Sequence, residues 1–162
     1  MTNPGTRPGI GELGVRIIAA EIGNDMSRWP SEKHFASWLG LCPDHRISGG
    51  QVLSRHTRRV VNKVSNALRQ AAVTLQNSQT ALGAFYRRMR GKLGAAAGVT
   101  ATAHKLARLV YRLLQHGELY VQQGLEDYER KYRERVLSNL KKTAANLGME
   151  VVQKQPLPSG VS

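Results

Sequence analysis

The chain has 162 residues and a single cysteine, Cys42, so it is long enough for a hydrophobic core but cannot form an internal disulfide or a cysteine metal cluster. No stretch approaches the roughly 18 consecutive apolar residues of a membrane span, and no apolar run after Met1 indicates a signal peptide. We therefore expect a cytoplasmic protein without a membrane partner.

The positive charge is concentrated in one segment. The net charge is +13, yet residues 45–117 contain thirteen lysines and arginines and no acidic residue, while the remaining eleven basic residues are balanced by eleven acidic ones. Such a segment attracts a polyanion through counterion release, although a basic surface kept for solubility is the plainer interpretation. Its complete lack of acids favours a nucleic-acid partner.

Two short helices are expected first, at residues 13–22 and 31–39. In the first, Val15, Ile18, Ala19 and Ile22 share one face, and Gly23-Asn24 supplies the C-terminal stop. In the second, Ser31 is a suitable N-cap and Gly40 ends the helix; the side chains expected to face inward are Phe35, Trp38 and Leu39.

Residues 41–53 contain Pro43 and Gly49-Gly50 and predict an irregular loop or a short hairpin. Ser54 or Thr57 is a candidate cap for a long helix over residues 55–77. The apolar stripe that predicts this helix consists of Val60, Val64, Leu68, Ala71 and Leu75.

Helical patterns continue to residue 147. We expect a helix at 79–90, a small-residue loop at 91–98, a helix at 100–116 stopped by Gly117, and an amphipathic helix at 125–147. The helix at 79–90 should bury Leu82, Phe85 and Met89. The helix at 100–116 should bury Ala103, Leu106, Ala107, Val110, Leu113 and Leu114. The fold class is thus all-α, with a domain at 1–117, an amphipathic helix at 118–147 and a disordered tail at 148–162.

The run Pro8-Gly9-Ile10-Gly11 precedes the first helix. Two glycines in a tight turn expose backbone N–H groups at a helix N-terminus, where the helix dipole favours an anion. In a helix-hairpin-helix this turn binds a DNA phosphate without reading sequence. An ordinary helix-start turn is the alternative.

Ser48 is the candidate nucleophile. It precedes Gly49-Gly50, whose flexible backbone opens the hydroxyl to a bulky phosphodiester, and Arg46 is close enough in sequence to neutralise phosphate charge. A lone serine needs an activating base or metal, and only Asp44 is a nearby acid. On composition alone this segment is a plain turn. The five histidines show no metal-ligand spacing, so no metal site is expected in this chain.

Residues 5–116 resemble the C-terminal transposase domain of the insertion-sequence one-ten type transposases, also called bridge-RNA-guided recombinases. Each piece is short, but their order and spacing are specific. The pieces are PGIG at 8–11, AAEIG at 19–23, MSRWPS at 26–31, FASWLGLCP at 35–43, SGG at 48–50, NALRQAA at 66–72 and TAHKLAR at 102–108.

The resemblance implies a mechanism and partners. The family joins a RuvC-like domain, with four metal-binding acids and Mg²⁺, to this domain, whose serine is the nucleophile on DNA. A guide RNA, a dimer or tetramer, and association with the bacterial nucleoid are implied as well. Ser48 would be catalytic; Gly9, Gly11, Arg46, Gly49, Gly50, Arg55, Arg58, Arg59, Lys63 and Arg69 would contact DNA or RNA.

The sequence also departs from the family. The acidic domain is absent from these residues, so the chain alone is expected to bind nucleic acid without cutting it. The basic stretch usual after Ser-Gly-Gly is replaced by residues 51–56. Three interpretations remain: a transposase part with a catalytic Ser48, a non-catalytic DNA- or RNA-binding module, and a defunct remnant in which 125–147 pairs with another chain.

Overall fold

The computed structural model describes residues 10–23, 25–43, 46–54, 57, 60 and 62–153. Its described part is all-α in class, with six α-helices, one 3₁₀ turn and one two-stranded hairpin. The chain divides into two compact units, Met1–Leu125 and Glu126–Ser162. The first unit contains the core, the hairpin and the start of the last helix.

The first two helices follow the expected capping. Helix α1 (Glu12–Ile22) starts at Gly11 and stops at Gly23, whose φ of 68° suits a glycine. Helix α2 (Glu32–Trp38) is capped by Ser31, whose hydroxyl accepts a hydrogen bond from the His34 backbone N–H. The predicted inward face of α1 is partly wrong, because Val15 and Ala19 are exposed and only Ile18 and Ile22 are buried.

The third helix begins later than the sequence suggested. Helix α3 (Lys63–Thr74) is capped by Asn62, whose side chain accepts from the Ser65 backbone N–H at 3.1 Å. Neither Ser54 nor Thr57 is the cap, because Ser54 lies in a strand and Thr57 forms a β-bridge with Pro43. Val60 extended the apolar stripe in sequence, but it is 40 % exposed. A 3₁₀ turn, η1 (Leu75–Asn77), follows.

Helices α4 (Ala81–Leu93) and α5 (Ala95–His116) form a tight pair, so the expected loop at 91–98 is wrong. Only Gly94 separates them, with a φ of 87°. The small residues serve helix packing: a Cβ added to Gly98 would lie 2.7 Å from the Cα of Arg90. Gly98 is therefore required by the close approach of the two backbones.

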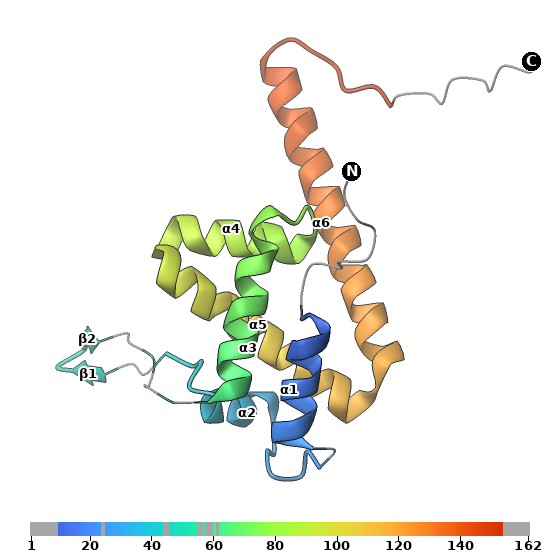
Figure 1. Cartoon of the computed structure of the whole chain (residues 1–162). Helices are drawn as coiled ribbons and strands as arrows, with labels where there is room; N and C mark the ends of the chain where they lie inside the picture. The colour runs from blue at the N-terminus through green and yellow to red at the C-terminus, as the bar shows by residue number, and fades with distance from the viewer. Residues whose placement is uncertain are drawn as a thin grey trace, which may run out of the picture. The chain divides into compact units, whose positions relative to one another are not determined.

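Helix α5 is central to the first unit, since it packs against α2, α3 and α4 (Figure 1). Its last turn is less buried than expected, with Leu113 and Leu114 about 40 % exposed. On α4, Tyr86 is buried, whereas Leu82, Phe85 and Met89 are only partly so. The largest fully buried side chains of the core are Phe35, Leu39, Leu41, Leu68 and Leu75.

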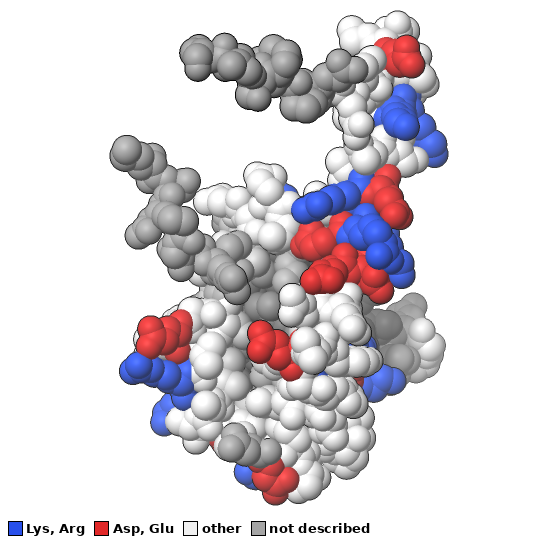
Figure 2. All heavy atoms as spheres, turned by 90° about the vertical axis from the view of Figure 1, so that its right-hand side faces the viewer, with Lys and Arg blue, Asp and Glu red and all other residues white. Residues whose placement is uncertain are grey.

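The last helix, α6 (Glu118–Asn146), has no buried residue. It begins directly after the Gly117 stop, at the first residue of the expected segment 118–147 and seven residues before the helical pattern expected at 125–147. Acidic and basic side chains are intermixed along it (Figure 2). No helix in the described ranges is long and apolar enough to cross a bilayer. Of the expected disordered tail, residues 148–153 have no regular structure and the rest lie outside the described residues.

Candidate functional site

Ser48 lies at the tip of a β-hairpin, so the hairpin alternative holds for this segment and the irregular loop does not. Strands β1 (Arg46–Ser48) and β2 (Gln51–Ser54) pair antiparallel, with Ser48 opposite Gln51 and Ile47 opposite Val52. Two residues, Gly49 and Gly50, connect them. Two-residue connections are the commonest tight hairpin turns, so the position of Ser48 along the hairpin is set by the turn.

Both turn glycines have positive φ, 56° at Gly49 and 78° at Gly50. This is the backbone of a type I′ turn, whose twist matches that of the flanking strands. A Cβ at either position would meet no atom within 4 Å. The requirement for glycine is therefore one of backbone conformation, and space at the tip is open to an approaching ligand.

The Ser48 side chain is exposed. Among the residues that the structure describes, no base or carboxylate contacts its hydroxyl; Asp44, His45 and His56 lie outside them. An isolated serine hydroxyl is a weak nucleophile, because its pKa is far above neutrality. The hairpin thus supplies accessibility and position, and a role of Ser48 as a nucleophile would require an activating group from outside the described residues.

The base of the hairpin is fixed to the core. Pro43 and Thr57 form an isolated antiparallel bridge on its two sides. Two residues earlier, Leu41 is 1 % exposed, and its N–H donates to the Ala36 carbonyl of α2 at 3.1 Å. The tip is therefore open while the entry of the hairpin is held by α2.

Helix α2 is held in turn by aromatic packing. Trp29 lies 5.1 Å from Phe35 and 4.9 Å from Trp38 between ring centroids, and Phe35 lies 5.9 Å from Tyr111 of α5. The Tyr111 hydroxyl donates to the Trp29 carbonyl at 2.9 Å. Both tryptophans belong to this aromatic packing rather than serving as platforms for a base.

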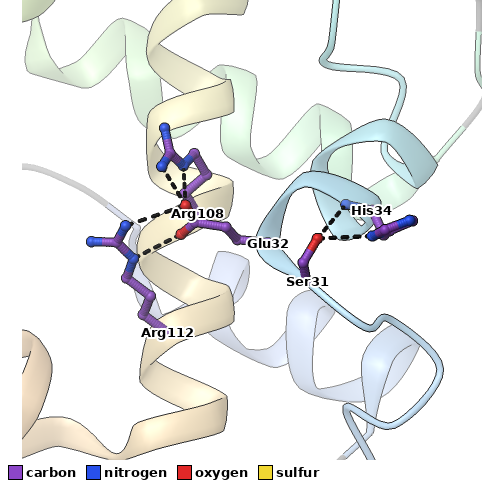
Figure 3. A network of polar contacts seen from close by, with 5 residues as sticks. All are labelled: Ser31, Glu32, His34, Arg108 and Arg112. Atoms are coloured by element: carbon purple, nitrogen blue, oxygen red, sulfur yellow. Dashed lines mark hydrogen bonds and ion pairs between the residues drawn. The ribbon is translucent and has the colours of Figure 1, made fainter.

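A carboxylate clamp joins α2 to α5 (Figure 3). Glu32 accepts hydrogen bonds from Arg108 Nε at 2.8 Å and from Arg112 Nε at 2.7 Å, and the terminal nitrogens of both guanidiniums also contact it. Burial would raise the pKa of Glu32, but the hydrogen bonds from Arg112 and Arg108 outweigh this and lower the pKa to about 2. Glu32 is therefore ionised at neutral pH, and two of the central cations are used structurally.

Sequence reasoning missed this clamp. Arg108 and Arg112 are four residues apart, so a helix places them on one face, and Glu32 is the first residue of α2. The helical spacing of the two arginines was a usable signal. A sequence separation of 76 residues between Glu32 and Arg108 hid their pairing.

The predicted nucleic-acid residues are only partly placed. Gly9, Arg55, Arg58 and Arg59 lie outside the described residues, and of Arg46 only the backbone, in β1, is described. Gly11 caps α1, and Gly49 and Gly50 form the turn beside Ser48.

Two further candidates lie on α3. Lys63 pairs with Glu21 of α1 at 2.9 Å, and Arg69 is partly buried with its Nε lacking a hydrogen-bond partner in the described part. The described contacts therefore connect Lys63 with α1 and do not show it beside Ser48.

The described residues do not fit a divalent metal. No group of three or more His, Cys, Asp or Glu side chains suited to a metal ion occurs in the described ranges. Cys42 is a partly buried free thiol, and burial raises the pKa of that thiol. Acids for the Mg²⁺ implied by the resemblance would have to be supplied from outside these residues.

Fold and site together define a helical domain that presents an exposed serine on a two-glycine hairpin. Residues 5–87, about half of the chain, match the family model described as "Transposase IS116/IS110/IS902 family". The chain belongs to this transposase family, which confirms the resemblance of the sequence motifs.

Two curated relatives agree. The chain is 30% identical over 125 residues to a protein of Sinorhizobium fredii named as a transposase, y4pF/y4sB, covering 71% of this chain and 31% of the relative. It is 26% identical over 116 residues to the 43.6 kDa protein of insertion element IS110 from Streptomyces coelicolor, covering 70% and 28%. The chain thus spans about a third of the length of these relatives. No solved structure matches it.

Proposed function

We propose that this chain is the serine-bearing, DNA-handling part of an IS110-type transposase, in which Ser48 attacks a DNA phosphodiester. The observation that carries the proposal is the exposed Ser48 at the tip of a hairpin whose two glycines leave the surrounding space open. Membership of the transposase family supports the reaction class, and the acid-free basic segment supports the substrate class.

The chemistry is a phosphoryl transfer. The Ser48 oxygen forms a bond to phosphorus and loses its proton to a base, while one DNA oxygen departs from the same phosphorus and takes up a proton. The product is a serine–DNA phosphodiester, which conserves the energy of the broken bond and can therefore be reversed by a DNA hydroxyl. The chain's own contribution is to hold the serine at an open tip.

The partners follow from the same proposal. We expect activation of Ser48 to depend on acids outside the described residues, which would also hold the Mg²⁺. The proposal also includes three features that the resemblance to the family implies. These are a guide RNA, a dimer or tetramer of the full-length enzyme, and association with the nucleoid in the cytoplasm. DNA contact through Arg46, Arg55, Arg58 and Arg59, close in sequence to the serine, is included in it.

Covalent capture tests the nucleophile. A full-length transposase containing this chain, incubated with end-labelled DNA of insertion-element ends and Mg²⁺, should give a protein–DNA adduct that survives denaturation. Ser48→Ala should abolish the adduct, a reduction of at least about a hundredfold, because the attacking oxygen is removed. Gln51→Ala, an exposed position opposite Ser48 in the same hairpin, is the matched control and should retain it.

The outcomes separate the proposal from its alternative. An adduct that persists in Ser48→Ala excludes the assigned role, and so does DNA cleavage by the unaltered enzyme without any adduct.

The absence of a base beside Ser48 among the described residues favours a second candidate, a non-catalytic DNA- or RNA-binding module. It predicts salt-dependent binding that is unaffected by Ser48→Ala and weakened by Arg58→Ala with Arg59→Ala.

A further inference from the structure

The C-terminal half of α4 carries a dense positive charge. Arg87, Arg88, Arg90 and Lys92 lie within its last seven residues, and neither α4 nor α5 contains an acidic residue. All four side chains are exposed. The ion pairs found in the described part of the chain involve residues of α1, α2, α3, α5 and α6, and none of them includes these four side chains.

These four cations differ in what they already contact. Arg87 donates to the carbonyls of Gln76 at 3.0 Å and Ser78 at 2.6 Å, so it closes the turn between η1 and α4. The backbone of Arg90 lies against Gly98 of α5. Arg88 and Lys92 are one helical turn apart and therefore share one side of α4.

Phe85 lies on the same side, one turn before Arg88. The guanidinium carbon of Arg88 is 5.5 Å from the centroid of the Phe85 ring, and the Lys105 ammonium of α5 is 4.4 Å from it. Because both cations lie over one ring, they are within about 10 Å of each other. We call Phe85, Arg88, Lys92 and Lys105 the Phe85 ridge.

The spacing of the ridge suits a row of phosphates. Arg88 and Lys92 are about 6 Å apart along the helix axis, given a rise of about 1.5 Å per residue. A DNA strand carries one negative charge about every 3.4 Å along its axis, so cations about 6 Å apart correspond to phosphates about two positions apart on the same strand. The α4–α5 packing fixes the helix, which lowers the entropy cost when the cations bind.

The ridge does not suit bases. The Phe85 ring is partly buried and has a cation close to it from each of two helices, so its face is not open as a stacking platform for an unpaired base. Binding of single strands depends on such platforms, whereas duplex binding depends on phosphates. The chemistry of the ridge therefore selects the outside of a duplex.

We propose that the Phe85 ridge binds the phosphate backbone of duplex DNA. This inference rests on the proposed DNA-handling role and adds a contact on α4 and α5, elements other than the serine hairpin. The contact is independent of sequence and positions the duplex, because only the backbone is reached.

Salt-dependent binding by the whole chain tests the ridge. Fluorescence anisotropy with a short labelled duplex should show that Arg88→Gln with Lys92→Gln weakens binding about tenfold or more near 0.1 M salt. The slope of log affinity against log salt should become shallower by about 0.9 for each phosphate that the variant no longer neutralises. Lys141→Gln with Lys142→Gln removes the same charge from exposed positions of α6 and should change affinity by less than about threefold.

Each result decides a different point. If the unaltered chain binds the duplex and the ridge variant binds equally well, or if both double variants weaken binding equally, the ridge assignment is wrong and the role of Ser48 is untouched. A reduction confined to labelled single-stranded RNA overturns the assignment to duplex DNA. If the unaltered chain binds no duplex, the DNA-handling role fails as well. Circular dichroism, with the single Gln variants beside the double one, should show unchanged helicity.

Discussion

Helices α5 and α6 follow each other in the chain but are stabilised in different ways. Helix α5 has 22 residues, of which seven are buried and none is acidic. Helix α6 has 29 residues, of which five are acidic, six are basic and none is buried. Helix α5 owes its stability to contact with three other helices. Helix α6 relies on local pairs such as Arg130 with Asp127 at 2.7 Å.

The difference shows how charge and burial are divided in this chain. Helix α5 contains no carboxylate that could pair with its cations. Arg108 and Arg112 instead pair with Glu32 of α2, and Lys105 lies over the Phe85 ring of α4. The mixed charges of α6 are balanced within the helix itself. We therefore expect substitutions in α5 to change stability strongly and equivalent substitutions in α6 to change it little.

The largest effect is expected from shortening a buried apolar side chain. Leu106→Ala on α5, where the leucine is 5 % exposed, should lower the free energy of unfolding by about 3 kcal/mol because burial is reduced and a cavity remains. Leu140→Ala on α6, where the leucine is 49 % exposed, should cost less than about 1 kcal/mol. Urea unfolding followed by circular dichroism measures both; equal effects would contradict the comparison.

Replacing a glycine with alanine should lower the stability in α5 and raise it in α6. Gly98→Ala places a Cβ 2.7 Å from the Arg90 backbone and should destabilise the chain by about 2 kcal/mol, even though alanine favours a helix. Gly124→Ala on α6 meets no atom within 4 Å and should stabilise its helix by about 0.5 kcal/mol. Thermal unfolding of the two variants provides the measurement, and a stabilising Gly98→Ala would refute the close approach of α4 and α5.

A smaller, pH-dependent effect should follow from the clamp. Because the folded pKa of Glu32 is about 2 and its ordinary value is 4.5, the stabilisation is fully present above about pH 4.5 and is lost as the pH falls through about 2. Glu32→Gln should lower the free energy of unfolding by about 1 to 2 kcal/mol at pH 6 and by much less near pH 2. The effect at pH 6 is modest because both arginines are partly exposed.

The control for the clamp is an exposed pair on α6. Asp127→Asn removes the partner of Arg130 and should cost less than about 0.5 kcal/mol at any pH in this range. Unfolding of each variant by urea at several pH values gives the comparison. A Glu32→Gln effect that does not shrink toward pH 2 would show that the carboxylate charge is not what stabilises the α2–α5 contact.

Local signals in the sequence predicted local structure well. Ser31 as a cap and Gly23 and Gly117 as stops act through a few neighbouring backbone groups, and the structure confirms each of them. The paired glycines left a loop and a hairpin open, and the structure shows the hairpin. The accessibility of Ser48 followed from the same kind of signal.

Features that depend on residues distant in the sequence are not predicted by local patterns. Small residues at 91–98 resemble a loop in sequence, but Gly98 is small because α4 passes beside it. Val60 matches the period of the α3 stripe although the helix starts only after Asn62. The clamp and the Phe85 ridge depend on how α2, α4 and α5 pack, which periodicity within one helix cannot give.

The two-glycine turn also sets the cross-strand neighbour of Ser48. Residues paired directly across an antiparallel hairpin carry their side chains on the same face, so the number of residues in the turn decides which residue of β2 lies beside Ser48. Adding one residue between Gly49 and Gly50 would remove the two-residue turn, so either the turn type or the pairing of Ser48 with Gln51 would have to change without altering any chemical group. Loop length is thus as much a part of the candidate site as the serine itself.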